Sequence, residues 1–201
     1  MLLDKIAPGK TVFDAEELPA LYGGDGYWQT ALPMPLTSTL WHSLVALPHP
    51  RRGYPDFAEP GEVPVALEND DGSGDAPNSV MLETARWLIA NDEVVERAII
   101  KTILADLPGL QRIESQATRG DGRPLPERWD EPTIRPLIRL LYIVIHDVTG
   151  QLPYFGVEFA CTWEDEHGYG IMFHGTEVVK TGGGDVPNLS WVAARHAKNN
   201  V

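Results

Sequence analysis

The chain has 201 residues, 43% of them hydrophobic, which suits one globular domain with a substantial core. Its net charge of −13 argues against nucleic acid and anionic membranes as partners, because both are polyanions, and favours basic proteins. The single cysteine, the lack of an apolar run long enough to span a membrane and the absence of a signal-like start together predict a cytoplasmic protein.

The first 62 residues predict an irregular N-terminal part with short strands. Strands are expected at 11–14 and 27–34, joined by a loop or one helical turn and a glycine cluster. The short apolar stretch 37–47 fits a strand or a helix, and we favour a strand. Prolines recur through 48–64, where irregular backbone is expected because proline lacks an amide donor and fixes φ.

A helical hairpin is the clearest local prediction. A strand at 63–67 leads into an acidic loop at 68–78, and a helix with apolar residues at three- and four-residue steps follows at 79–90. Ser79 is the expected N-cap of this helix. A second helix is expected at 93–106, with Asp92 as a cap and Pro108-Gly109 as a stop signal. The stretch 111–129, with several glycines and prolines, predicts an exposed excursion.

The C-terminal part predicts an antiparallel meander. A short helix at 133–139 leads into it, and apolar, β-branched runs alternate with short turns, which leave no room for crossover helices. The four strands are expected at 140–148, 154–163, 168–174 and 177–180, and a terminal helix at 187–197. We therefore expect a single α+β domain over 1–201, in which a helical hairpin packs on one face of an antiparallel sheet.

Ionisable residues gather in the predicted turn after the second strand of the meander. Glu164, Asp165 and Glu166 stand there as an exposed acidic group, and Asp70 and Asp71 form a second one in the acidic loop. These five residues are our candidates for partner contacts, since charged rims steer association. The ordinary alternative is that they are solvated acids that cap free turn amides.

A metal site is the alternative use of the same turn. His167, His174, Glu166 and Asp185 would be its ligands if a divalent metal were bound. Their spacing matches no established metal motif. His174 is expected on the strand face of Gly170 and Met172, whereas His167 lies in the turn. We therefore predict neither a metal nor any other cofactor.

Other residues with chemical potential have structural explanations. Cys161 alternates with Val157 and Phe159 on an apolar strand face, which indicates an inert core thiol. Trp163 is expected in the core. The run Gly182–Gly184 lacks the Lys-Ser/Thr that follows a phosphate-binding loop, so we expect positive φ and close approach of another segment there. No catalytic residue is predicted.

The stretch from Gly156 to Gly170, GVEFACTWEDEHGYG, followed by His174, Val178-Val179 and GGGD at 182–185, resembles a bacterial domain family of unknown function. That family has a G-x-E-F-x-C-T-W-D-E-E-H-G-x-G pattern and a later G-G-A-D. The chain departs from it at Glu164-Asp165 and at Gly184. The resemblance covers about 45 residues closely and 63–110 more loosely, so 63–201 is the family-like core. Members occur near polymorphic toxin genes, which implies an immunity-type role but no reaction.

Two functions from different classes follow. The first is a non-enzymatic immunity protein that binds and neutralises a basic bacterial toxin, of the polymorphic, type VI-secreted kind, through its acidic surface. The second is a metal-dependent hydrolase or small-ligand domain that uses His167, His174 and nearby carboxylates. No nucleic-acid or membrane partner is expected, and the sequence leaves a homodimer open.

Overall fold

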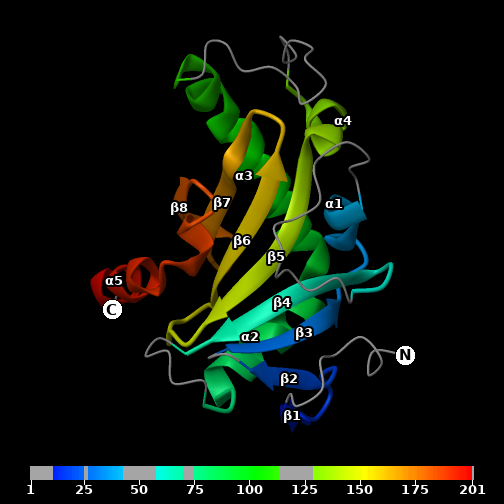
Figure 1. Cartoon of the computed structure of the whole chain (residues 1–201). Coiled ribbons are helices and arrows are strands. Elements are labelled where there is room, and N and C mark those ends of the chain that lie inside the picture. The colour runs from blue at the N-terminus through cyan, green and yellow to red at the C-terminus, as the bar shows by residue number, and fades with distance from the viewer. Residues whose placement is uncertain (1–10, 25–26, 43–57, 70–74, 114–128, 201) are drawn as a thin grey trace.

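The structure is a computed structural model that describes residues 11–24, 27–42, 58–69, 75–113 and 129–200. These residues form an α+β fold built on one eight-stranded sheet (Figure 1). Its strands are β1 (Thr11–Phe13), β2 (Leu21–Gly24), β3 (Tyr27–Pro33), β4 (Glu62–Glu68), β5 (Ile138–His146), β6 (Tyr154–Cys161), β7 (Glu164–His174) and β8 (Glu177–Gly182). Its helices are α1 (Ser38–His42), α2 (Ser79–Ala90), α3 (Asp92–Ile113), α4 (Glu131–Ile134) and α5 (Ser190–Asn199), with 3₁₀ turns η2 (Arg135–Leu137) and η3 (Val186–Asn188).

Strand order in the sheet follows the order of the chain, from β1 at one edge to β8 at the other. Every neighbouring pair is antiparallel except β4 and β5, which are parallel. Parallel neighbours need a long crossover connection, and α2 and α3 lie within that connection here. The predicted meander of β5 to β8 is thus confirmed, and the N-terminal strands extend the same sheet.

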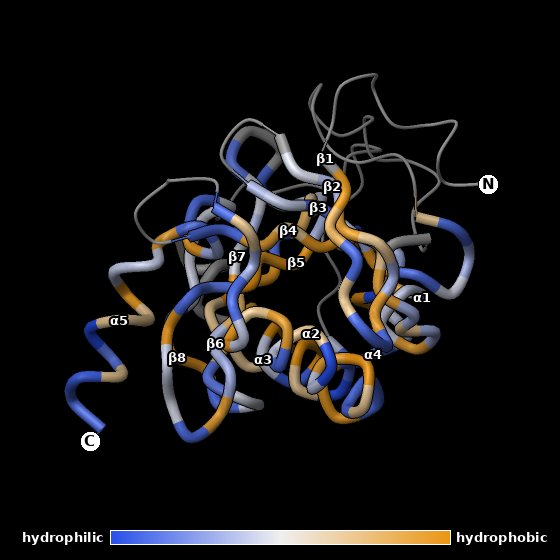
Figure 2. The backbone as a smooth tube through the Cα atoms, turned by 90° about the horizontal axis from the view of Figure 1, so that it is seen from below, coloured by the Kyte–Doolittle hydropathy of each residue, from blue (hydrophilic) through white to orange (hydrophobic). Residues whose placement is uncertain are grey.

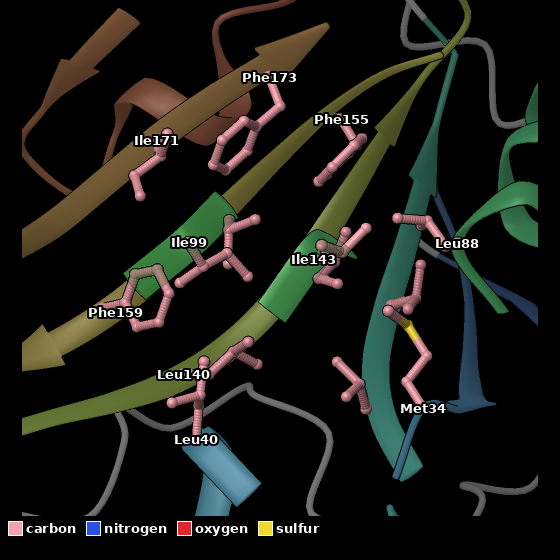
Figure 3. Close-up of a cluster of buried hydrophobic side chains, with 14 of the residues drawn as sticks. Met34, Leu40, Leu88, Ile99, Leu140, Ile143, Phe155, Phe159, Ile171 and Phe173 are labelled. Atoms are coloured by element: carbon pink, nitrogen blue, oxygen red, sulfur yellow. The ribbon is translucent and has the colours of Figure 1, made fainter. Parts of the chain in front are cut away.

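The two faces of the sheet bury different clusters. Along β6, Phe155, Val157 and Phe159 face α2 and α3, as the strand period of two requires. Figure 3 shows Phe155, Phe159 and Ile143 in the same buried cluster as Leu88 of α2 and Ile99 of α3. Each such fully buried side chain contributes roughly 1.5–3 kcal/mol. The predicted packing of the helical hairpin on one face is therefore confirmed.

The opposite face of β6 to β8 is covered by η3 and α5. Tyr154 and Met172 on that face pack with Val186 of η3 and Ala193 of α5. In Figure 2 α5 lies apart from α2 and α3. The terminal helix was predicted, and Val192 and Ala193 are its buried residues, whereas Trp191 is 54% exposed. Within the described chain, no helix combines the length and apolarity needed to cross a membrane.

Two N-terminal elements differ from the prediction. Part of the loop expected between the first strands is β2, whose Leu21 is fully buried and whose Tyr22 pairs with Gln29. In the stretch 37–47, expected as a third strand, the described residues 38–42 form the short helix α1, and 43–47 lie outside the described residues. The Asp92 carboxylate accepts hydrogen bonds from the Leu36 and Thr37 amides, which lie just before α1, and these bonds fix where the helix begins. Leu40 of α1 is fully buried.

The helical hairpin is longer than its local signals indicate. Asn78, not Ser79, is the N-cap of α2, and its side chain accepts from the Met81 amide at 3.1 Å. The helix α3 continues to Ile113 through the predicted stop at 108–109. Ile103 and Leu107 are fully buried against the sheet, so tertiary packing outweighs the local cost of proline.

Ahead of the meander, the helix expected at 133–139 begins and ends two residues earlier, as α4 followed by η2, and β5 starts at Ile138. Three predicted irregular segments lie partly outside the described residues: 48–57 of the proline-rich segment 48–64, 70–74 of the acidic loop 68–78 and 114–128 of the excursion 111–129. The described residues 62–64 belong to β4 and 111–113 to α3, so these ends of the predicted irregular segments are wrong.

Asp92 joins the N-terminal strands to the helical hairpin. Its buried carboxylate accepts the Leu36 amide at 2.7 Å and the Thr37 amide at 2.9 Å. Asp92→Ala is expected to lower the free energy of unfolding by about 2–3 kcal/mol, because it leaves two amides without their charged acceptor. Asp92→Asn keeps one oxygen acceptor and should cost less. Urea unfolding of both variants checks this, and an equal loss would contradict it.

Candidate interaction surfaces

The acidic residues of the signature stretch lie on a strand, which corrects their predicted place in a turn. The chain reverses at Thr162-Trp163, and β7 begins at Glu164, whose Cα pairs with that of Cys161. Trp163 is buried beside Trp129 and Tyr169, so the reversal places its ring in the core, as predicted. Because Trp163 is buried, the turn lies at Thr162-Trp163, before the acidic residues Glu164 to Glu166 where it was expected.

The Glu164 side chain contacts His167 on the same strand, β7. Its Oε1 accepts the His167 amide at 3.1 Å and lies 3.4 Å from His167 Nδ1, and its side chain is 29% exposed. The backbone of Asp165 and Glu166 belongs to β7, but their side chains are outside the described set. Asp70 and Asp71 lie outside the described residues altogether.

The residues of the metal hypothesis are not gathered at one point. His167 and His174 are seven residues apart on β7, which a strand rise of 3.3 Å converts to roughly 23 Å. Asp185 lies on the His167 side, since a Cβ on Gly183 would meet Asp185 Oδ1 at 3.2 Å and His167 Cβ at 3.9 Å. Among the described side chains no group of three His, Cys, Asp or Glu residues is arranged to hold a metal ion.

His174 instead belongs to an aromatic cluster that packs α5 against the sheet. Its ring stacks on Tyr154 with centroids 4.5 Å apart, and its Nε2 accepts the Leu152 amide at 3.3 Å. The Tyr154 hydroxyl is 2.9 Å from Nδ1 of His196 on α5. Burial lowers the pKa of His174, and the neighbouring His196 lowers it further, so the ring favours its neutral form.

The glycine run allows a close approach of backbone. A Cβ on Gly184 would lie 2.4 Å from the His167 carbonyl oxygen, and the Gly184 amide donates to that oxygen at 2.9 Å. The predicted close approach is confirmed. The predicted positive φ is wrong here: among the described glycines it occurs at Gly61, Gly168 and Gly175.

The segment after the glycine run seats Pro187 on the sheet. A Cβ on Gly156 or Gly170 would come within 2.4 Å of Pro187 atoms, so both strands need glycine where η3 crosses them. Below Pro187 lies His146, which is 1% exposed and whose Nε2 is 2.7 Å from the Pro187 carbonyl oxygen. A carbonyl only accepts, so Nε2 carries the proton. The sequence marked His146 only as the end of a strand.

A second acidic surface, which the sequence did not single out, lies at one end of β1 to β4. Thr30 Oγ1 bonds the Ala20 carbonyl at 3.1 Å, and the Met34 amide bonds Gly61 O at 2.9 Å. The first contact joins the connection 14–20 to β3, and the second joins the connections 34–37 and 59–61, so all three lie at the same end of the antiparallel strands β1 to β4. We call the carboxylates on this surface the acidic end: Asp14, Glu16, Glu17, Glu59 and Glu62.

The acidic end is predominantly negative, and its elements also carry exposed apolar side chains. The described residues 11–24, 27–42 and 58–69 contain no lysine or arginine. Arg86 of α2 reaches this surface but donates to the Glu16 backbone oxygen, at 3.0 Å. Val12 of β1 is 54% exposed, and Leu36 in the connection 34–37 is 46% exposed. Exposed apolar side chains with a charged surround are typical of interaction surfaces.

The sheet and the helices packed on its two faces define an α+β protein. The profile of a domain of unknown function (DUF6985) matches residues 52–189, which run from before β4 to the end of η3. The chain therefore belongs to this family, whose description names no activity. Comparisons with curated proteins and with solved structures find no match.

Proposed function

We propose that this protein is a non-enzymatic, cytoplasmic immunity-type protein that binds a basic protein toxin and blocks its action. The observation that carries the proposal is the acidic end, whose carboxylates gather at one end of β1 to β4, where the described strands and connections contain no lysine or arginine. Blocking by binding needs only a complementary surface of ordinary interface size.

Charge explains how such a surface selects its partner. A patch of one sign raises the rate of encounter with an oppositely charged protein, and the effect falls as salt screens it. Val12 and Leu36 supply apolar area that holds the complex after encounter. The acidic end therefore fits a basic surface with apolar side chains near its centre.

The acids of the signature stretch and of the acidic loop belong to the same proposal as a second contact region. It comprises Glu164, Asp165, Glu166, Asp70 and Asp71. Glu164 already bonds the His167 amide, so its reversal disturbs the start of β7 as well as any partner. The acidic end gives a cleaner test because Glu16 and Glu17 are exposed.

Affinity capture tests the proposal. Tagged protein is incubated with lysate of the source organism, washed at low and high salt, and the retained proteins are identified by mass spectrometry. We expect one basic partner, retained at low salt and lost at high salt. Glu16→Lys with Glu17→Lys should reduce its retention about tenfold or more, since each reversal replaces attraction by repulsion.

Two control variants separate charge from folding. Glu16→Asp with Glu17→Asp keeps both charges and should retain the partner. Glu177→Lys reverses a charge on β8, at the other edge of the sheet, and should also retain it. Equal retention by the reversed variant, at matched folding by circular dichroism, would refute the acidic end as the binding surface.

A further inference from the structure

A groove runs between α3 and β8, at the sheet edge opposite the acidic end. Its volume is about 660 Å³, within the usual range of ligand and peptide sites. One stripe of α3, with residues at three- and four-residue steps, forms one wall, and β8 forms the other. The residues that matter below are Val94, Arg97, Ala98, Lys101, Ala105 and Val178.

The groove exists because the helix layer ends before the sheet does. Val178 pairs with Phe173, so its side chain points to the face that α2 and α3 cover. Phe173 is 1% exposed, but Val178 is 46% exposed. On the opposite wall Val94 is 44% exposed. Val178 and Val94 are thus exposed to solvent where the layer of α2 and α3 could accommodate another helix or strand.

The α3 wall sets the charge of an occupant. Arg97 and Lys101 are one helical turn apart, exposed, and both line the groove. Arg97 also pairs with Glu93, but both side chains are more than 60% exposed, where such pairs contribute little. Ala98 and Ala105 are small, so a second backbone can approach this wall closely.

The other end of the groove carries two carboxylates, Asp106 on α3 and Glu177 on β8. Tyr169 donates to Asp106 Oδ2 at 3.0 Å, and burial raises the pKa of the Tyr169 hydroxyl, which keeps its proton on this bond. The Asp106 carboxylate is therefore engaged in a hydrogen bond that joins α3 to β7. The two cations of α3 remain the exposed charges of that wall, and they complement carboxylates.

The edge itself disfavours an added strand. The register of β7 and β8 shifts at Val179, so the outer row of backbone donors and acceptors is interrupted there. Lys180, exposed on this edge strand, is a further feature that discourages strand pairing. A helix needs no regular edge, and the neighbouring strands of this face are covered by helices.

We propose that this groove is the docking site for an amphipathic helix of a partner protein. Its apolar side chains, spaced i, i+3 or i+4, and i+7, cover Val94 and Val178, and carboxylates on one flank face Arg97 and Lys101. The stripe from Val94 to Asp106 is roughly 18 Å long, which fits about three turns of helix. This site is independent of the acidic end, so either proposal can fail alone.

A displayed library of helix-forming peptides tests the proposal with the full-length protein. The core positions vary among apolar residues, and the flanks vary among Glu, Ser and Lys. Selection on the wild type is followed by counter-selection on Val178→Asp. We expect enriched peptides with apolar residues at helical spacing and Glu on one flank. An enriched peptide should bind Lys101→Glu about tenfold more weakly in fluorescence anisotropy and regain affinity when its Glu residues become Lys.

Lys198→Glu, an equal charge reversal on α5 outside the groove, should leave binding unchanged. Val178→Asp alters an edge strand, so circular dichroism is used to check that this variant is folded. If it is unfolded, the comparison of Lys101→Glu with Lys198→Glu still tests the proposal. Four results would overturn the proposal: no enrichment, enrichment of Lys-flanked or extended peptides, full binding after a central proline is added, or equal effects of the two reversals.

Discussion

Gly156→Ala should lower the free energy of unfolding by about 2–3 kcal/mol, the range of a poorly tolerated small-to-large change. The added methyl group would lie 2.4 Å from both Cα and the carbonyl oxygen of Pro187, which are backbone atoms that cannot rotate away. The strand or η3 must move, and either movement disturbs the cluster under α5. In a strand with open space the same substitution would be favourable, so the sign itself tests the packing.

Gly183→Ala is the matched control. Its methyl group would meet only the end of the Asp185 side chain at 3.2 Å and His167 Cβ at 3.9 Å, and Gly183 is not among the glycines with positive φ. Its free energy of unfolding should stay within about 0.5 kcal/mol of wild type, since reduced freedom of the unfolded chain offsets the tight contact. Urea unfolding measures both variants, and similar losses would contradict the close seating of Pro187 on Gly156.

His146 should make the protein less stable in mild acid. Burial lowers the pKa of its imidazole to about 4, from an ordinary value near 6.5. Between these values the unfolded chain binds a proton that the folded chain does not, so stability falls as pH drops through this window. The difference corresponds to roughly 3 kcal/mol between pH 7 and pH 4. Above pH 6.5 the contribution is fully present.

His146→Leu isolates this contribution from the carboxylates that titrate in the same range. The variant loses the bond to the Pro187 carbonyl at all pH values, but its stability should change with pH less steeply than that of wild type between pH 6.5 and 4. Chemical denaturation at several pH values gives both slopes. An NMR titration that found an ordinary imidazole pKa for His146 would contradict the buried, neutral ring.

Periodicity was enough to predict much of the fold. The alternation of Val157, Phe159 and Cys161 with polar neighbours placed β6 correctly, and the apolar steps of 79–90 placed α2. The antiparallel meander followed from short turns such as Gly175-Thr176, which joins β7 to β8. These signals are local, so one sequence carries them.

The errors arose where distant residues decide the local structure. The helix α1 depends on amides held by Asp92, more than 50 residues away in the chain. The helix α3 passes Pro108-Gly109 because the preceding apolar residues are packed on the sheet. The turn before β7 is set by burial of Trp163 in the core. No pattern within a short window contains these contacts.

The candidate surfaces likewise include features that the sequence indicated and features that only the three-dimensional structure reveals. The sequence placed His174 on a strand and His167 in a turn, which left their convergence open, whereas the structure places both on β7, seven residues apart. The acidic end combines carboxylates of the connections 14–20 and 59–61 with Glu62 of β4, which the strand order places at one end of β1 to β4, so only the topology reveals it. The groove between α3 and β8 likewise needs the register that turns Val178 toward the helix layer. The glycine spacing hinted at close packing but did not identify Pro187.

Neutralisation in cells tests the central claim most directly. The basic partner retained in affinity capture is expressed from an inducible promoter, alone or with this protein, and growth is followed. Wild type, Glu16→Asp with Glu17→Asp, and Glu177→Lys should each restore growth, whereas Glu16→Lys with Glu17→Lys should not. A partner that is harmless when expressed alone, or full protection by the doubly reversed variant at equal protein levels, would contradict an immunity function exerted through the acidic end.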